Sequence, residues 1–159
     1  MTSKTEENAV TEMCDHTYSG DIVCNVANAK GLHLHFKVAD DKSVEAVLEC
    51  DPAFEGYPGI LHGGVISTVL DVAMGHCMFV RGRAAVTVEM TTRFRHPVLI
   101  GKNAVVSAQL ARPSHPLYLL EAKIVQDGVV RATAKGKFFH QPKLNYVCER
   151  VVPCDTLTP

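Results

Sequence analysis

Hydrophobic and polar residues alternate along much of the chain with the two-residue period of half-buried β-strands. The first such segment, GLHLHFKVA at 31–39, predicts a strand with its apolar residues on one face and with His33 and His35 in solvent. Five further segments share this character: SVEAVLEC, GRAAVTVEMTTRF, NAVVSAQLAR, LYLLEAKIVQ and VVRATAKGKFF. The last two flank Asp127-Gly128, a dipeptide that favours a two-residue hairpin turn. The pattern predicts an antiparallel sheet.

The third of these strands, within 82–94, predicts two distinct faces. Strict alternation places four polar or charged residues on one face (Thr87, Glu89, Thr91 and Arg93) and four apolar residues on the other (Val86, Val88, Met90 and Phe94).

One segment, LHGGVISTVLDVAMGHCMF at 61–79, is apolar without alternating and predicts a buried helix. Its polar interruptions exclude a membrane span. A helix that is hydrophobic nearly all round must be covered on several sides. We therefore predict an α+β fold, in which a sheet curls around one long helix and a second copy of the chain covers what remains.

Composition narrows the class of protein. The 159 residues suit one domain, for which we predict an irregular arm over 1–27, a folded core over 28–139 and an extension over 140–159. A formal charge of −1, from 16 basic and 17 acidic residues, argues against nucleic-acid and membrane partners. The opening MTSKTEENAVTEM has neither a secretory nor a transit pattern, so we expect a cytoplasmic protein.

The six scattered cysteines include no CxxC pair, which favours reduced thiols and predicts no metal site. A zinc site assembled from Cys14, His16 and Cys24 is the less favoured alternative.

Asp71 is the only formal charge between Glu55 and Arg81, and an ionised carboxylate in apolar surroundings needs a partner or a function. The other candidate group is Gly63-Gly64, which leaves backbone N–H groups open at the helix start, where they can bind an anion or an oxyanion. Seven residues of helix separate Gly64 from Asp71 by about 10 Å. Both groups can act on one substrate only if two chains form the site, as in a two-fold dimer.

The stretch YPGILHGGVISTVLDVAMG, followed by VTVEMTTRFRHPVLIG, resembles the hotdog-fold acyl-CoA thioesterases of the phenylacetic-acid-degradation and thioesterase-superfamily-member type. The resemblance covers residues 28–139. It implies a hotdog fold, an acyl-CoA substrate, no cofactor, and a homodimer or dimer of dimers. It also implies hydrolysis of a thioester to a free carboxylic acid and coenzyme A.

The resemblance assigns roles to individual residues. Asp71 is the catalytic carboxylate, acting as general base or as nucleophile, and the N–H of Gly63 or Gly64 from the partner chain is the oxyanion contact. Thr87 matches a strand Ser or Thr that places the water, and His62 shapes the loop before the helix. Some family members carry an Asn where this chain has Gly56.

Two sets of residues are expected to bind the substrate. Arg93, Arg95, Lys102 and Lys137 are candidate partners for the phosphates of coenzyme A, and an acyl tunnel is expected along Val65, Val69, Met74 and Met78. Two alternatives stay open. One is a non-catalytic acyl-CoA binder. The other is an enoyl-thioester hydratase that uses Asp71 and His76, although five residues separate these two by about 140° around a helix.

Overall fold

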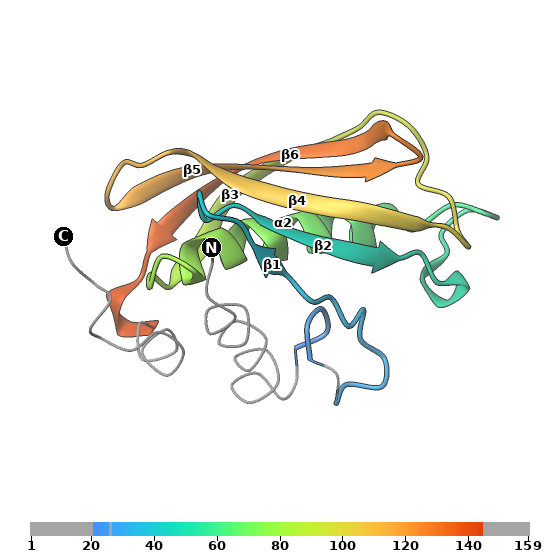
Figure 1. Cartoon of the computed structure of the whole chain (residues 1–159), viewed down its shortest axis with the longest axis horizontal. Helices are drawn as coiled ribbons and strands as arrows, with labels where there is room; N and C mark the ends of the chain where they lie inside the picture. The colour runs from blue at the N-terminus through green and yellow to red at the C-terminus, as the bar shows by residue number, and fades with distance from the viewer. Residues whose placement is uncertain (1–20, 26, 145–159) are drawn as a thin grey trace.

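The structure is a computed structural model that describes residues 21–25 and 27–144. A six-stranded antiparallel sheet lies over one α-helix (Figure 1). Its strands are β1 (Lys37–Val38), β2 (Val44–Glu49), β3 (Ala85–Phe94), β4 (Asn103–Arg112), β5 (Leu117–Gln126) and β6 (Val129–His140). The helix α2 spans Gly63–Phe79, and two short 3-10 helices, η1 and η2, span Pro52–Phe54 and Pro142–Leu144. The predicted α+β hotdog architecture is confirmed.

The strand order is β1-β2-β4-β5-β6-β3, so β3 forms one edge of the sheet and pairs only with the last strand. The β5–β6 hairpin turns at Asp127 and Gly128, as predicted, and both adopt positive φ (53° and 74°). This conformation is the one that a two-residue hairpin turn requires.

The core lies between the sheet and α2. Alternate residues of β2, β4, β5 and β6 are buried, and their neighbours face the other side of the sheet. Val69, Leu70, Ala73 and Met74 of the helix are fully buried against them. Among the described residues, no helix is long and apolar enough to cross a membrane.

The prediction of a strand over residues 31–39 is mostly wrong. Only Lys37–Val38 of segment 31–39 pair as a strand. Positive φ at His33 (52°) interrupts the extended backbone before it. Burial still alternates there, with Leu34 and Phe36 buried and both histidines, His33 and His35, exposed as predicted.

Residues 21–25 and 27–36 cover the side of α2 opposite the sheet (Figure 1). Backbone hydrogen bonds join Leu32 N–H to the carbonyl of Ile22 and Leu34 N–H to that of Val23. Phe36 stacks on His76 of the helix at 4.5 Å between ring centroids. The chain itself thus covers part of the helix surface that the sequence pattern predicts a second copy to cover.

The predicted faces of β3 need correction. The register between β3 and β6 shifts between Thr87 and Glu89, which marks a β-bulge. Thr87 therefore points toward α2, on the same side as Met90, while Glu89 pairs with Lys137 on the far face of the sheet. The prediction from strict alternation that Thr87 and Glu89 share one face is therefore wrong.

Two sequence predictions fall partly outside the described residues. These are the irregular arm over 1–27, of which residues 21–25 and 27 are described, and the extension over 140–159, of which 140–144 are described. Cys14 and His16 of the alternative zinc site lie outside them too.

Candidate functional site

The start of α2 is built around His62. His62 is the N-cap residue, and its Nδ1 accepts a hydrogen bond of 2.9 Å from Gly64 N–H. This bond occupies one of the two glycine N–H groups that the sequence left open. Gly63 N–H has no acceptor among the described residues. Of the two glycines, Gly63 is therefore the one that can offer a hydrogen bond to a ligand oxygen.

Gly56 lies against His62. A Cβ placed on Gly56 would lie 3.1 Å from His62 Cα and 3.3 Å from its Cδ2. The Asn of some family members could not stand at this position unless His62 moved. A glycine at position 56 therefore fits the close approach of His62.

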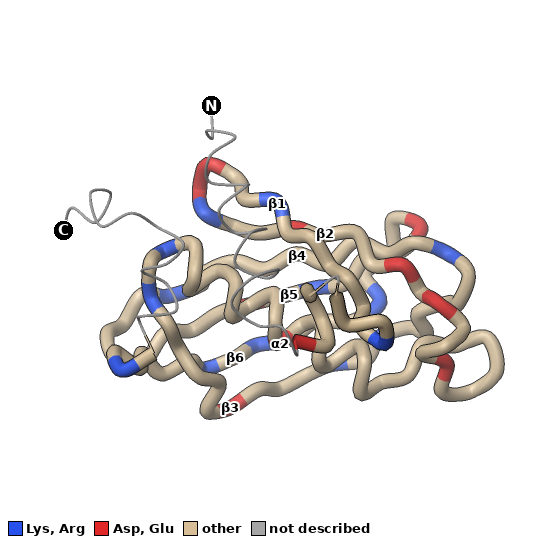
Figure 2. Tube along the Cα trace, turned by 90° about the horizontal axis from the view of Figure 1, so that it is seen from below, with Lys and Arg blue, Asp and Glu red and all other residues tan. Residues whose placement is uncertain are grey.

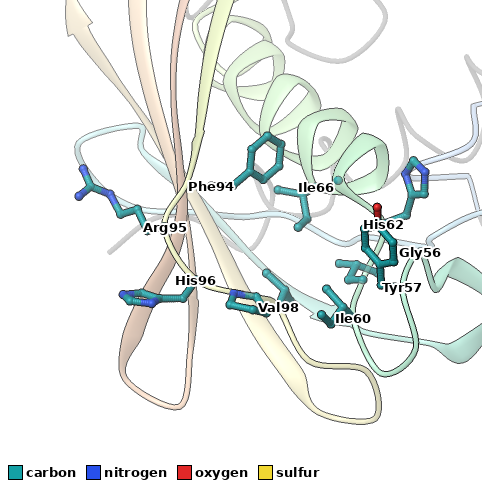
Figure 3. Close-up of a pocket in the computed structure, with 12 residues that line it drawn as sticks. Gly56, Tyr57, Ile60, His62, Ile66, Phe94, Arg95, His96 and Val98 are labelled. Carbon is teal, nitrogen blue, oxygen red and sulfur yellow. The ribbon is translucent and has the colours of Figure 1, made fainter.

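A cavity of about 650 Å³ opens at this helix start (Figure 3). One wall is the loop before α2, the second is the segment after β3, and the first turn of the helix forms the floor. The lining residues are Gly56, Tyr57, Ile60, Leu61, His62, Gly63, Ile66, Phe94, Arg95, His96, Pro97 and Val98. His62 and Gly63 thus share one cavity.

Asp71 lies further along the helix and is half-buried. Its Oδ1 accepts a hydrogen bond of 2.6 Å from the hydroxyl of Thr87 on β3. Within the described part of the chain, no cation pairs with Asp71. The carboxylate is therefore oriented by a neutral donor, and its second oxygen is open to accept a further hydrogen bond.

The two halves of the candidate site do not meet in one chain. The cavity at Gly63 includes neither Asp71 nor Thr87. Asp71 lies about two helical turns further along α2, and Thr87 contacts it from β3. This separation along α2 is the one that the helical spacing of Gly64 and Asp71 predicts.

His76 does not approach Asp71. Its Nδ1 lies 3.0 Å from the carbonyl of Val72, to which it must donate, and its Nε2 lies 3.8 Å from Cys24 Sγ. The ring is 4% exposed and packs between Phe36 and Phe79. The hydratase hypothesis loses its second catalytic group, because His76 belongs to the core.

The predicted substrate-binding residues separate into different surroundings. Arg93 lines a groove on the sheet face opposite α2, and Arg95 lines both that groove and the cavity at Gly63. Val65 is half-buried in the first turns of α2, whereas Met74 is fully buried against Gly136 of β6. Met74 packs the core of this chain and does not line an open tunnel, and the same holds for Val69 and Met78.

Tyr57 and Phe94 are site residues that the sequence analysis missed. They are 81% and 57% exposed, and both line the cavity. Tyr57 stands in a loop without periodicity, so no pattern marks it. Phe94 was assigned to an apolar strand face, and only its position at the very end of that strand could have signalled a different role.

The described residues hold no group of three or more His, Cys, Asp or Glu that could bind a metal ion. Along the described chain, Figure 2 shows several acidic residues close together at the right-hand end and mostly basic ones at the left-hand end.

Residues 58–132 match the sequence model of the thioesterase superfamily. The chain is thus similar to this superfamily over a segment that makes up just under half of its length. The resemblance found in the HGG-to-Asp segment is confirmed, because Gly63, Gly64 and Asp71 all lie within the matched residues.

Comparison with proteins of known sequence or structure shows how far the likeness extends. The chain is 35% identical to acyl-coenzyme A thioesterase THEM4 of Bos taurus over 105 residues, which are 65% of this chain and 43% of that protein. It thus spans less than half the length of the curated relatives it matches.

Two solved structures share the fold. The PaaI protein of the phenylacetic acid degradation operon of E. coli superposes with a TM-score of 0.70 at 20% identity, over 86% of this chain and 96% of that one. A Streptococcus mutans protein solved with bound acetyl CoA has a TM-score of 0.64 at 17% identity, over 68% and 88% of the two chains.

Proposed function

We propose that this chain hydrolyses acyl-coenzyme A thioesters to a carboxylic acid and coenzyme A. The observation that carries the proposal is the hydrogen bond from Thr87 to Asp71 on an otherwise apolar helix. Burying part of a carboxylate there costs free energy that folding alone does not explain. A carboxylate oriented by one oxygen and open at the other is suited to take a proton from water.

In the proposed mechanism Asp71 is the general base. Its free oxygen removes a proton from a water molecule, whose oxygen attacks the thioester carbonyl carbon. The carbonyl oxygen becomes an oxyanion and accepts a hydrogen bond from Gly63 N–H, which the positive end of the helix dipole strengthens. The C–S bond then breaks, and the thiolate of coenzyme A takes up a proton. Because Thr87 donates its only hydroxyl proton to Asp71, its oxygen remains an acceptor that can orient the same water.

The site is proposed to form between two copies of the chain. Strand β3 carries both half-sites: Thr87 near its beginning contacts Asp71, and Phe94 at its end lies beside Gly63. The outer side of β3 pairs with no described strand. If two copies pair antiparallel about the middle of β3, the Thr87 end of one chain lies next to the Phe94 end of the other.

The exposed side of α2 supports the same dimer. Gly64, Thr68, Asp71 and Gly75 recur at helical spacing and are not fully buried in the single chain. Their small size lets a second helix approach closely, so that an antiparallel partner helix brings its Gly63 toward Asp71. Phosphate groups of coenzyme A would meet Arg95 at the rim of the cavity, with Arg93 on the outer face beyond it. A dimer of dimers is the proposed assembly.

The experiment is release of free coenzyme A from a panel of acyl-CoAs, short, long and aromatic, by the wild type and by Asp71→Asn. Asp71→Asn is isosteric, and it should abolish turnover without changing the circular dichroism spectrum or the elution volume. An enzyme-only blank corrects for the protein's own thiols. Cys50 and Cys77 contribute little to it, since burial raises the pKa of each to about 11. Binding of acyl-CoA without turnover by the wild type would contradict hydrolysis and favour a non-catalytic binder.

A mixing experiment tests the shared site. Gly63→Pro removes one N–H at the first helical position, where proline is tolerated, and His62 already has the extended backbone (ψ 133°) that precedes proline. Asp71→Asn and Gly63→Pro homodimers should both be inactive. Mixed dimers contain one site with both substitutions and one with neither, so mixing should restore about half of the activity per dimer. Failure to restore activity in verified mixed dimers would place both groups in one chain.

A further inference from the structure

We propose that Phe94 selects the acyl group by forming the wall of the cavity beside Gly63. The inference rests on the proposed function and goes beyond it, because it assigns one side of the cavity to the acyl part of the substrate and one residue to its choice.

Phe94 lies directly against the first residue of α2. A Cβ placed on Gly63 would lie 3.6 Å from both Cε1 and Cζ of the Phe94 ring. Figure 3 shows the ring projecting from the end of β3 toward Ile66 of the helix. A carbonyl oxygen bound to Gly63 N–H would therefore place the atoms next to it in contact with this ring.

The fold does not require an aromatic residue here. Phe94 is 57% exposed and lies outside the buried core, whereas Phe138 of the neighbouring strand is 2% exposed and belongs to it. Its ring instead lines the cavity, and apolar and aromatic side chains are typical of the lining of ligand pockets.

The chemistry of the cavity favours the acyl group over the pantetheine arm. Ile60, Ile66 and Val98 join Phe94 in an apolar wall, and Figure 3 shows Arg95 and His96 projecting away from His62 and Tyr57. The pantetheine arm carries two amides, which need hydrogen-bond partners when they are buried. A hydrocarbon or aromatic acyl group needs none, and so matches this lining.

The size of the ring then sets a limit on bulk near the carbonyl. Truncation at position 94 enlarges the cavity at the point where the acyl chain leaves the carbonyl carbon. The kcat/KM for larger or branched acyl groups should therefore rise relative to that for small ones, because the enlarged cavity no longer excludes their additional volume.

The experiment compares wild type, Phe94→Leu and Phe94→Ala, with Phe139→Ala as the matched control. Phe139 is also an exposed aromatic residue (39%), on β6, and does not line the cavity. Two quantities are measured: the ratio of kcat/KM for a bulky and a short acyl-CoA, and the dissociation constants of free coenzyme A and of non-hydrolysable thioether analogues with the same two acyl groups.

The inference predicts that Phe94→Ala shifts the bulky-to-short ratio about tenfold toward the bulky substrate, with Phe94→Leu in between and Phe139→Ala unchanged. The affinity of free coenzyme A should stay constant, because it has no acyl group. A parallel loss of affinity for free coenzyme A and for both analogues would overturn the inference and place the pantetheine arm against Phe94. An unchanged ratio would overturn it as well.

The two proposals can fail separately. If no acyl-CoA is hydrolysed but the analogues bind, hydrolysis is contradicted, and the analogue affinities of Phe94→Ala still decide the role of the ring. If turnover occurs and the ratio does not move, only the role of Phe94 is wrong.

Discussion

The hydroxyl of Thr87 donates a hydrogen bond of 2.6 Å to Oδ1 of Asp71, and this bond joins the edge strand of the sheet to its central helix. A β-bulge directly after Thr87 makes the contact possible, since it turns Thr87 toward the helix while Glu89 faces away. The carboxylate is thereby oriented through one oxygen by a neutral donor, and no cation among the described residues pairs with it.

Thr87→Val should lower kcat by about 10-fold to 100-fold, because it removes a hydrogen bond to a charged group without changing the side-chain shape. Thr87→Ser, which retains the hydroxyl, should keep most of the activity. Steady-state kinetics of both variants test this. In an Asp71→Asn background, Thr87→Val should cause no further loss, since the two residues act as one unit. Independent, additive losses would argue against the coupling.

Gly63→Pro should reduce kcat by about 100-fold to 1,000-fold, the cost of losing one oxyanion-hole donor. Gly63→Ala is the control, because it keeps the N–H and its Cβ makes only ordinary contact with Phe94 at 3.6 Å. The comparison is of kcat and of the thermal midpoint for both variants. Equal kcat in Gly63→Pro and Gly63→Ala would remove Gly63 N–H from the mechanism.

His62→Ala should lower the free energy of unfolding by about 0.5–2 kcal/mol, since it removes the side-chain acceptor of Gly64 N–H at the helix start. His62→Asn should lose less, because asparagine is a good N-cap residue. Urea unfolding of both variants measures the difference. A greater loss in the asparagine variant would show that the ring packs rather than caps.

Gly136→Ala should destabilise the protein by about 1–3 kcal/mol through overpacking. The added Cβ would lie 2.6 Å from Phe138 Cε2 and 3.0 Å from Met74 Sδ, in a core with no space to spare. Lys135→Ala, on the adjacent residue with a side chain that is 81% exposed, should leave the free energy of unfolding nearly unchanged. Chemical denaturation compares the two. A neutral Gly136→Ala would mean that the helix can shift away from β6.

Asp127→Asn should lower stability at neutral pH but not in acid. The hydrogen bond from Lys102, at 2.7 Å, and the charge of that ammonium hold the pKa of Asp127 below its ordinary value. A carboxylate with a lowered folded pKa stabilises the protein above its unfolded pKa and loses this effect as the pH falls through the folded pKa. Asparagine tolerates the positive φ of 53°, so the turn itself is preserved. Urea unfolding at several pH values tests this, and a difference that persists in acid would assign the effect to the turn.

Much of the fold follows from local patterns in the sequence. The apolar run at 63–79 and the turn at Asp127-Gly128 are each specified by a few neighbouring residues, and both form as predicted. Segment 31–36 shows the limit of such patterns. Its buried and exposed residues alternate as in a strand, but positive φ at His33 ends the extended backbone, and the segment covers a helix instead of pairing in the sheet.

The candidate site was predictable in its residue types and less so in its geometry. A lone carboxylate on an apolar helix marks Asp71 in the sequence itself, and the spacing to Gly64 already implies two chains. The orientation of Thr87 was not predictable, because one bulge reverses a strand face. The cap formed by His62 and the exposed ring of Phe94 depend on contacts between distant segments, which no single-sequence periodicity records.

The strand order also has a consequence for synthesis on the ribosome. Strand β3 precedes β4 and β5 along the chain, yet β6, with which it pairs, follows both, and β1 and β2 are the only strands of the described sheet that are made before α2. The side of the apolar helix that packs on the sheet is therefore not fully covered until β4, β5 and β6 have been translated. Nascent chains of this protein should depend on chaperones that hold hydrophobic segments until the sheet can close.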